Sequence, residues 1–240
     1  MTRELVYGRN AVRELLRGPR EVLEVWVSER AAGRLPWLGA DPRPLVKRER
    51  ALTEAAGTRD HQGVVAWCEP FRYADAYELA SVEHPLLVLL DQVTDPRNLG
   101  AVARSAEGAG ASGLVLPAHR SAMVTSAVCR ASAGAVEHLP IAIVPNLARY
   151  LEEVKGPRLW AYGADPAGEV SFWEADLAEG AALVLGAEGR GIRPLVRRAC
   201  DAMVSIPLLG KVESLNVAVA AGVLLFEARR QRVASSRVRA

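Results

Sequence analysis

The feature that most constrains this fold is a series of short, continuously apolar runs that begins at His84 and alternates with segments of helical spacing. Strands that are apolar on both faces are typical of parallel sheets with helices covering each side. The chain therefore predicts an α/β domain built on a mainly parallel sheet. The expected strands are PLLVLLD, SGLVLP, LPIAIV, RLWAYG, AALVLG and AMVSIP. A last helix is expected over 213–232, and its apolar face comprises Val217, Ala220, Ala221, Leu224 and Leu225.

The first third of the chain predicts a separate, smaller α/β module. Its apolar spacing predicts helices over 8–18 and 48–57 and strands over 21–29, 44–48 and 61–70. These are too few elements for a large core, but they suffice for a domain of about 70 residues. The following stretch is more polar and less patterned, which indicates a linker with a short helix. We therefore expect a small domain over 1–72, a linker over 73–84 and a large domain over 85–240.

Charge is unevenly distributed along the 240 residues, although the formal net charge is only +2. Residues 1–72 carry 13 basic and 10 acidic side chains, and the tail from Arg229 carries five arginines and no acid. The middle of the chain has an acidic excess. Because 27 of the 30 basic residues are arginine, whose planar fork suits phosphate, the composition permits an RNA partner. Codon bias or adaptation to heat would explain the arginine excess equally well.

Several classes of protein are disfavoured. No apolar run approaches the roughly 18 residues that span a bilayer, and the start of the chain lacks a signal-peptide core, so we expect a cytoplasmic protein without a membrane span. The three cysteines are far apart and are expected to be buried thiols. None of the four histidines lies at metal-ligand spacing from a cysteine or another histidine. We therefore expect no metal site.

Three turns at the carboxyl ends of expected strands carry unusual residues, and in open α/β sheets ligands bind at such ends. The first turn has Asn98, Gly100 and Arg104. The second, LGAEGRGI, surrounds Glu188 with glycines, and the third leads through Ser214 and Asn216 into the last helix. The second turn lacks the G-x-G-x-x-G spacing of dinucleotide folds, and LGKVES lacks the features of a phosphate-binding P-loop.

Together the three turns resemble the three motifs of the SpoU/TrmH family of RNA ribose 2′-O-methyltransferases. NLGAVARSAEGAG is similar to the first motif, LGAEGRGI to the second, and IPLLGKVESLNVAVAAGVLLFE to the third. VYGRNAVRELL and HQGVVA resemble the substrate-binding module of the bacterial 23S ribosomal RNA guanosine-2′-O-methyltransferases. The resemblance covers nearly the whole chain.

The resemblance implies a topology that the pattern alone does not. Periodicity predicts an ordinary doubly wound sheet, since knots are nearly absent from folds. Members of the family instead form a deep trefoil knot in the C-terminal α/β domain, bind S-adenosylmethionine there and act as homodimers. The implied function is methylation of a ribose 2′-hydroxyl in RNA, with a guanosine of 23S ribosomal RNA as the favoured target. The alternatives are a transfer RNA enzyme, a resistance-type ribosomal RNA enzyme, and a catalytically silent RNA-binding protein.

The resemblance also assigns roles to single residues. Cofactor binding falls to Gly186, Ile206 and Leu215, which fits a glycine that lets backbone approach a ligand and two aliphatic side chains that enclose an adenine. Arg104 is implied as the general base. Because a guanidinium is a poor base, electrostatic stabilisation of the developing alkoxide is the alternative role for Arg104.

The remaining polar residues of the motifs are expected around that arginine. Asn98 is expected either to bond the loop or ribose or to cap its helix. Glu188 is expected to orient Arg104 or Asn98. Ser214 is expected to cap the last helix, with Asn216 facing away from it, and the family places both at the active site. In the first domain, Arg9 and Asn10 are candidate RNA contacts.

Overall fold

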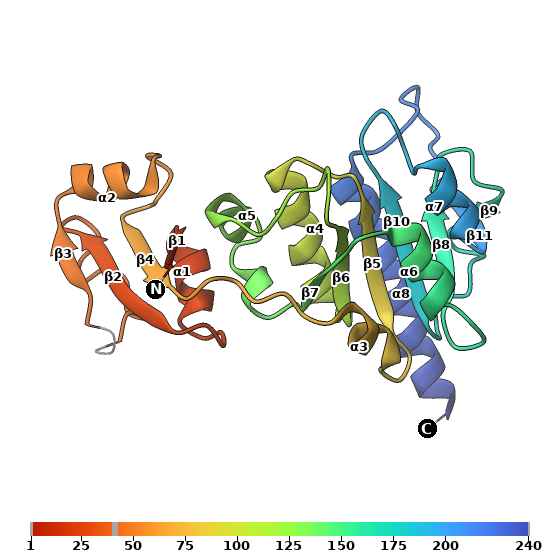
Figure 1. The fold of residues 1–240 in the computed structure, drawn as a ribbon, viewed down its shortest axis with the longest axis horizontal. Coiled ribbons are helices and arrows are strands. Elements are labelled where there is room, and N and C mark those ends of the chain that lie inside the picture. The colour runs from red at the N-terminus through yellow and green to blue at the C-terminus, as the bar shows by residue number, and fades with distance from the viewer. Residues whose placement is uncertain (1, 40–42, 240) are drawn as a thin grey trace.

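The structure is a computed structural model that describes residues 2–39 and 43–239, and it contains two α/β units along one long axis (Figure 1). The N-terminal unit has a four-stranded sheet in the order β1-β4-β2-β3, in which β4 pairs antiparallel with β1 and β2, and β2 pairs parallel with β3. Its elements are β1 (Glu4–Tyr7), α1 (Arg9–Leu15), β2 (Val22–Ser28), β3 (Leu45–Lys47), α2 (Glu49–Ala56) and β4 (Val64–Cys68). Strand β1 was not expected from the sequence, because four residues are too short for a clear alternation.

The two helices of this unit cover opposite faces of its sheet. Strand residues alternate between the faces, so Val64 packs with α1 while its neighbour Val65 packs with Leu52 of α2. The face under α1 continues into the core of the second unit. The N-terminal unit therefore shares apolar packing with the rest of the chain.

The C-terminal unit confirms the expected parallel sheet. Its strands lie in the order β7-β6-β5-β10-β8-β11-β9, and every neighbouring pair is parallel. The two-residue edge strand β9 (Val170–Ser171) was not expected. The other strands are β5 (Leu86–Asp91), β6 (Gly113–Pro117), β7 (Ile141–Val144), β8 (Trp160–Ala164), β10 (Ala181–Gly186) and β11 (Ala202–Ser205).

Helices cover both faces of this sheet, which explains why its strands are apolar throughout (Figure 1). One face packs against α4 (Pro96–Ala109) and α8 (Val217–Arg239), with α5 (Ser126–Ala131) and the short helix η1 (Ala135–Glu137) beside α4. The other face packs against α3 (Ala76–Ser81), α6 (Leu147–Val154) and α7 (Pro194–Ala199). On α8 the buried residues include Val217, Ala221, Leu224 and Leu225, as expected.

The segment between the two sheets contains the expected short helix, α3. Ala76 and Leu79 of α3 are buried against the second sheet, and Ala74 forms a parallel bridge with Ala142 of β7. This helix is therefore anchored to the C-terminal unit.

A buried ion pair joins the two units. Arg20 precedes β2, and its Nε donates a 2.9 Å hydrogen bond to the carboxylate of Glu137 in η1. Both side chains are at most 5% exposed. The two units also approach closely at Gly8, where an added Cβ would lie 2.5 Å from Cδ of Arg130. These contacts fix how the N-terminal unit sits on the C-terminal one.

Within the described ranges, no helix is both long and apolar enough to cross a membrane.

The segment after β11 leads through 206–216 into α8, which returns to pack on α4 and β10. The trefoil knot itself stays a prediction.

Candidate active site

A cavity of about 630 Å³ lies at the carboxyl ends of β8, β10 and β11. Three loops line it, namely 164–167, 185–191 and 206–217 as it enters α8. Six of the eight predicted site residues line this one cavity: Gly186, Glu188, Ile206, Ser214, Leu215 and Asn216. Two of the three separate turns thus converge, as expected for strand ends in a parallel sheet.

The glycines of the second turn have a structural reason that differs from the expected one. A Cβ added at Gly186 would lie 2.0 Å from the carbonyl carbon of Gly191, so the loop folds directly back over Gly186. Gly189 and Gly191 have φ values of 73° and 65°, in the region that favours glycine. Gly186 is therefore required by the chain itself, in addition to any ligand that approaches it.

A polar cluster connects all three motifs beside the cavity. The Nδ2 group of Asn98 donates a 3.1 Å hydrogen bond to Oε1 of Glu188. The Nδ2 group of Asn216 donates to Oδ1 of Asn98 at 3.0 Å and also to Oε1 of Glu188. Glu188 therefore orients Asn98, which is one of the two partners expected for it, and the amide oxygen of Asn98 faces Asn216.

The helix caps differ from those expected. Asn216 caps α8, because its Oδ1 accepts the backbone N–H groups of Ala218 and Val219 at 2.9 and 3.4 Å. The predicted cap, Ser214, lies two residues too early and instead lines the cavity with an exposed side chain. Asn216 thus serves the helix with its oxygen and the polar cluster with its nitrogen.

Asn98 is likewise not a cap. Asp95 caps α4 by accepting the backbone N–H of Arg97 at 2.8 Å, and Pro96 occupies the first turn. Hydrogen bonds from the side chain and backbone of Arg97 lower the pKa of Asp95, which keeps this cap ionised. The side chain of Asn98 is consequently available to Glu188 and Asn216.

Arg104 does not join this cluster. It lies six residues beyond Asn98 on α4, which places it about 9 Å further along the axis and about a third of a turn around it. Its side chain is exposed and forms no hydrogen bond or ion pair with any residue in the described ranges. Within the described ranges of a single chain, the hydrogen-bonded cluster therefore consists of Asn98, Glu188 and Asn216, and the convergence of Arg104 and Ser214 with them stays a prediction.

Sequence reasoning missed two residues that build the site. Asp91 ends β5 and is fully buried, and it accepts hydrogen bonds from the backbone N and Nε of Arg193 at 2.8 and 2.7 Å. This pair anchors the far end of the second turn. Asp165 lines the cavity after β8 and pairs with Arg197. Both aspartates follow apolar runs directly, so the strand-end rule would have identified them.

The cavity lining suits a ligand that is part apolar and part cationic. Leu185, Ile206 and Leu215 contribute aliphatic surface, and the glycine-rich turn exposes backbone groups. Asp165 and Glu188 contribute carboxylates. A volume near 630 Å³ is within the range of cofactor sites. The residues present therefore fit S-adenosylmethionine, which combines an adenosine with a sulfonium and an amino acid.

A parallel α/β sheet with this glycine-rich cavity at its strand ends, flanked by a hydrogen-bonded Asn–Glu–Asn cluster, defines an α/β enzyme with a cofactor site next to a polar substrate site. The match to known families is specific: residues 85–226 match the SpoU rRNA methylase family, and residues 5–74 match the RNA 2′-O ribose methyltransferase substrate-binding domain. The chain belongs to the SpoU rRNA methylase family.

Full-length relatives and solved structures agree with this membership. The 23S rRNA (guanosine-2′-O-)-methyltransferase RlmB of Pseudomonas putida is 41% identical over 240 residues, covering 95% of this chain and 97% of the relative. The SpoU methyltransferase AviRb of Streptomyces viridochromogenes, solved in complex with AdoMet, has a TM-score of 0.80 at 28% identity and covers 95% of this chain and 90% of its own. The TrmH/SpoU tRNA modifying enzyme of A. aeolicus has a TM-score of 0.57 at 29% identity and covers 67% of this chain and 82% of its own.

Proposed function

We propose that the protein transfers a methyl group from S-adenosylmethionine to a ribose 2′-hydroxyl of RNA, and that its target is a guanosine of 23S ribosomal RNA. The observation that carries this proposal is the position of the Asn98–Glu188–Asn216 cluster at the rim of the cavity lined by Gly186, Ile206 and Leu215. Such a site can hold a cofactor and a second substrate side by side, which is the geometry that group transfer needs.

Cofactor binding is assigned to the cavity. Ile206 and Leu215 would enclose the adenine, and the backbone around Gly186 would hold the rest of the ligand. When bound, S-adenosylmethionine supplies an electrophilic methyl group on sulfur. The carboxylates of Asp165 and Glu188 favour the positive charges of such a ligand.

The ribose is held by the polar rim. Ser214 presents an exposed hydroxyl at the cavity, and Asn98 and Asn216 are held in fixed orientations by Glu188. Prearranged hydrogen-bonding groups of this kind orient a hydroxyl without a reorganisation cost during the reaction. Arg104 is assigned to stabilise the alkoxide that forms as the 2′-hydroxyl loses its proton.

The position of Arg104 supports a homodimer. On α8 the large apolar side chains of Val219 and Phe226 are 52% and 54% exposed. Phe226 lies against Gly108 of α4, one helical turn from Arg104 on the same side of that helix. A second copy of the chain on this apolar face would bury it. Arg104 would then border the partner's site, and the charge missing from the Asn–Glu–Asn cluster would come from the partner's Arg104.

The N-terminal unit favours ribosomal RNA over transfer RNA. The ribosomal RNA enzyme of Pseudomonas putida matches 95% of this chain, whereas the tRNA modifying enzyme of A. aeolicus covers 67% of it. The proposal includes the three-part division at residues 72 and 84, the trefoil knot of the C-terminal unit, and action in the cytoplasm.

The test is incubation of the purified protein with methyl-labelled S-adenosylmethionine and separate fractions of unmodified 23S, 16S and transfer RNA. We expect label in 23S RNA at an alkali-resistant linkage, since a 2′-O-methyl group blocks cleavage at that position. Label in transfer RNA alone would overturn the substrate assignment. Cofactor binding without labelling of any RNA would favour a silent RNA-binding protein.

A further inference from the structure

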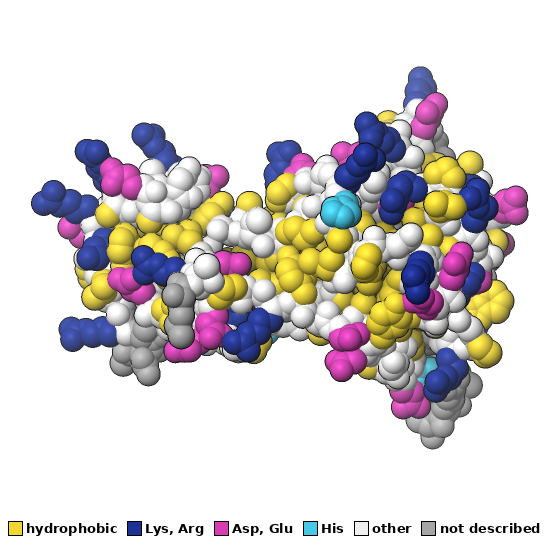
Figure 2. Space-filling model, viewed as in Figure 1, with side chains coloured by type: hydrophobic (Ala, Val, Ile, Leu, Met, Phe, Trp, Pro, Cys, Tyr) yellow, Lys and Arg dark blue, Asp and Glu magenta, His cyan; other side chains and the backbone are white. Residues whose placement is uncertain are grey.

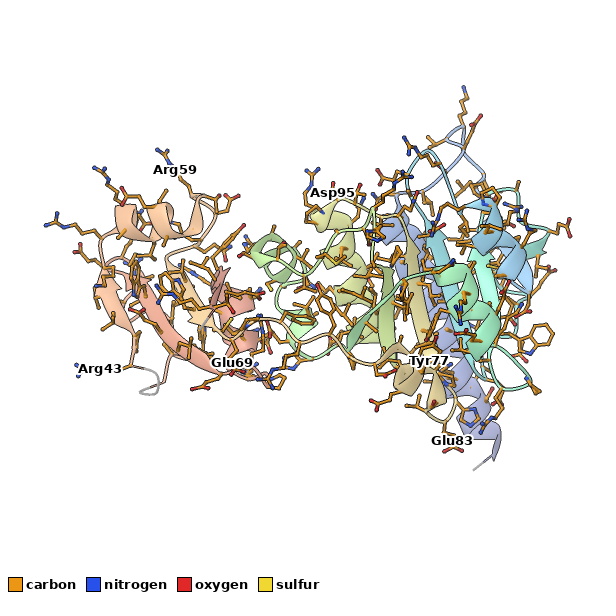
Figure 3. All side chains as sticks on the ribbon, viewed as in Figure 1. Arg43, Arg59, Glu69, Tyr77, Glu83 and Asp95 are labelled. Carbon is orange, nitrogen blue, oxygen red and sulfur yellow. The ribbon has the colours of Figure 1, made fainter. Side chains whose placement is uncertain are left out.

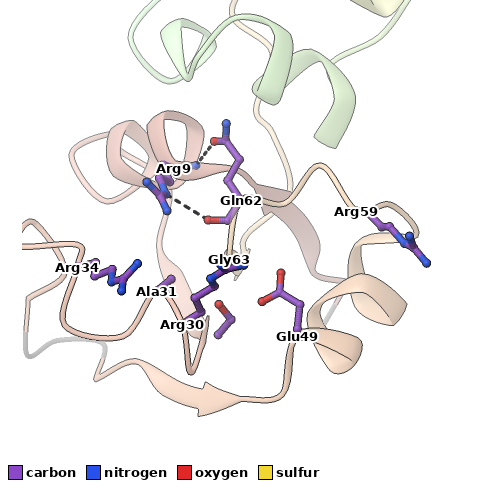
Figure 4. A pocket seen from close by; sticks show the side chains of 9 residues that line it. Arg9, Arg30, Ala31, Arg34, Glu49, Arg59, Gln62 and Gly63 are labelled. Carbon is purple, nitrogen blue, oxygen red and sulfur yellow. Dashed lines mark hydrogen bonds between the residues drawn. The ribbon is translucent and has the colours of Figure 1, made fainter.

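A second cavity lies in the N-terminal unit, at the other end of the molecule's long axis from the proposed methyl-transfer site. Its volume is about 510 Å³. It is formed by the start of α1, the turn after β2, the start of α2 and the loop between α2 and β4 (Figure 4). Of the residues that line this cavity, the sequence named only Arg9 as a candidate RNA contact, and Arg30, Arg34, Arg59 and Ser28 were not assigned a role.

The lining of this cavity is strongly basic. Arg9, Arg30, Arg34 and Arg59 line the cavity, and Glu49 is the one carboxylate among the described residues that line it (Figure 4). Arg30, Arg34 and Arg59 are exposed, and their side chains make no ion pair or hydrogen bond with any described residue. Most other arginines of this unit pair with acids, as Arg17 does with Glu14 and Arg50 does with Glu54. The guanidinium groups of the cavity are therefore available to an anionic ligand. Lys and Arg side chains project from the surface of the N-terminal unit (Figure 2).

The loop that carries Arg59 is held rigidly. Gln62 has a positive φ of 54°, which is uncommon for a residue with a side chain. Its side-chain oxygen accepts the backbone N–H of Arg9 at 3.0 Å, and its carbonyl accepts Nε of Arg9 at 3.2 Å (Figure 4). His61 is buried, and its Nδ1 accepts the N–H of Gly63 at 3.0 Å. Arg9 is thereby fixed with its terminal nitrogens unused, which lowers the entropy lost on binding.

The serine of an otherwise buried strand end borders this cavity and provides a second, independent sign of a ligand site. Ser28 is 2% exposed, lines the cavity and makes no side-chain hydrogen bond with any residue of the described part. A Cβ added at Gly63 would lie 2.8 Å from its Oγ, so the loop leaves no room for another side chain there. A serine that makes no side-chain hydrogen bond to protein and borders a cavity is free to bond a ligand or water there.

We propose that this cavity binds the sugar-phosphate backbone of the RNA substrate at a nucleotide remote from the one that is methylated. The arginine forks take the phosphate oxygens, and Ser28 donates to a phosphate or ribose oxygen. This inference rests on the proposed function, and it adds the residues by which the N-terminal unit holds RNA.

The arrangement of the two sites supports one continuous RNA. Arg59 at the cavity and Asp95 at the start of α4 lie on the same long side of the molecule (Figure 3). The buried Arg20–Glu137 pair, which lies between the two sites, fixes the orientation of one unit relative to the other. A folded RNA can therefore contact both sites from one side, and their separation selects RNAs that present a phosphate at the matching distance.

The test compares two triple variants that change the net charge equally. The cavity variant is Arg30→Ala/Arg34→Ala/Arg59→Ala. The control, Arg17→Ala/Arg43→Ala/Arg50→Ala, removes three exposed arginines of the same unit that do not line the cavity. Equilibrium binding to an in vitro transcript of 23S ribosomal RNA is measured at several salt concentrations. Thermal unfolding and S-adenosylmethionine affinity serve as folding controls for both variants.

We expect the cavity variant to bind the transcript at least ~10-fold more weakly. The slope of the logarithm of its binding constant against the logarithm of the salt concentration should become shallower by about 0.7 to 0.9 for each phosphate contact that is lost. The control should keep the wild-type slope. Equal loss in both variants would reduce the effect to general charge and overturn the proposal, as would an unchanged slope in the cavity variant. Absence of methylation by the wild-type protein would instead refute the proposed function.

Discussion

Complementation between two inactive variants tests where Arg104 acts. The helical separation of six residues places Arg104 about 9 Å and a third of a turn from Asn98, which supports the proposal that the two groups at one nucleotide come from different chains. We therefore expect Arg104→Ala and Asn98→Ala to be inactive alone and to regain activity when mixed. Two differently tagged chains, co-expressed in equal amounts, provide the mixture.

The size of the recovery follows from the two-fold symmetry of a homodimer. Random association makes half of the dimers mixed, and in each mixed dimer one of the two sites combines an intact Asn98 with an intact Arg104. The mixture should therefore show about 25% of the wild-type rate. If Arg104 acted within its own chain, every site would carry a lesion and the mixture would be inactive.

A matched control makes the outcome independent of expression level. Wild type mixed with an equal amount of the double variant Asn98→Ala/Arg104→Ala should give about 25% activity if the sites are shared, since every site of a mixed dimer then has one lesion. The same mixture should give about 50% if each chain is self-contained. Initial methylation rates at saturating RNA and cofactor distinguish the two values. A rate near half in the control, with no recovery in the first mixture, would refute the shared site and the role argued from α4 and α8.

Three further predictions concern single features. Glu137→Gln should lower the free energy of unfolding by about 3 to 5 kcal/mol, because it leaves Arg20 charged and buried between the two units; chemical denaturation measures this, and Glu54→Gln, at an exposed pair, should change little. Gly186→Ala should abolish cofactor binding by calorimetry, because its Cβ would overlap the backbone of Gly191, whereas a normal affinity would show that the turn yields easily. Burial raises the pKa of the Cys129 thiol from 9.0 to about 12. The neutral thiol therefore contributes fully to the stability of the folded protein below pH 9, and this contribution is lost as the pH rises towards 12, because only the unfolded thiol ionises in that interval. Cys129→Ala should reduce the loss of folding stability between pH 9 and 12, and an unchanged pH profile would argue against the burial effect.

Sequence reasoning reached the sheet because its strands are buried on both faces, and continuous apolar runs such as that of β5 are visible without coordinates. It missed β1, whose four residues are stabilised by pairing with residues of β4 that lie 58 or more positions away in the chain. The periodicity of a short segment does not reveal pairing with a distant strand.

The site shows the same division between local and non-local information. The convergence of Gly186 and Ile206 follows from the rule that ligands bind at strand ends, and both residues do line one cavity. The cap of α8 was assigned to the wrong residue because Ser214 and Asn216 are both good caps, and only the start of the helix at Val217 decides between them. To predict that Arg104 lies outside the hydrogen-bonded cluster, one must know its angular position on α4. That position depends on where the helix begins, which Asp95 and Pro96 determine.

The buried boundary between the units bears on how the two proposed RNA contacts cooperate. A flexible linker would let the N-terminal unit raise the local concentration of RNA without selecting its shape. Here Arg20 is held by Glu137 and also donates to Glu4 at 3.1 Å and to the backbone oxygen of Glu69 at 3.3 Å, so a tilt of the unit would leave a buried charge unsatisfied. With that rigidity, an RNA that fits the cavity but not the methyl site gains only part of the binding energy. Discrimination between RNAs then depends on the spacing of the two sites, and insertion of residues into the 73–75 connection should reduce selectivity for the 23S transcript more than it reduces affinity for unstructured RNA.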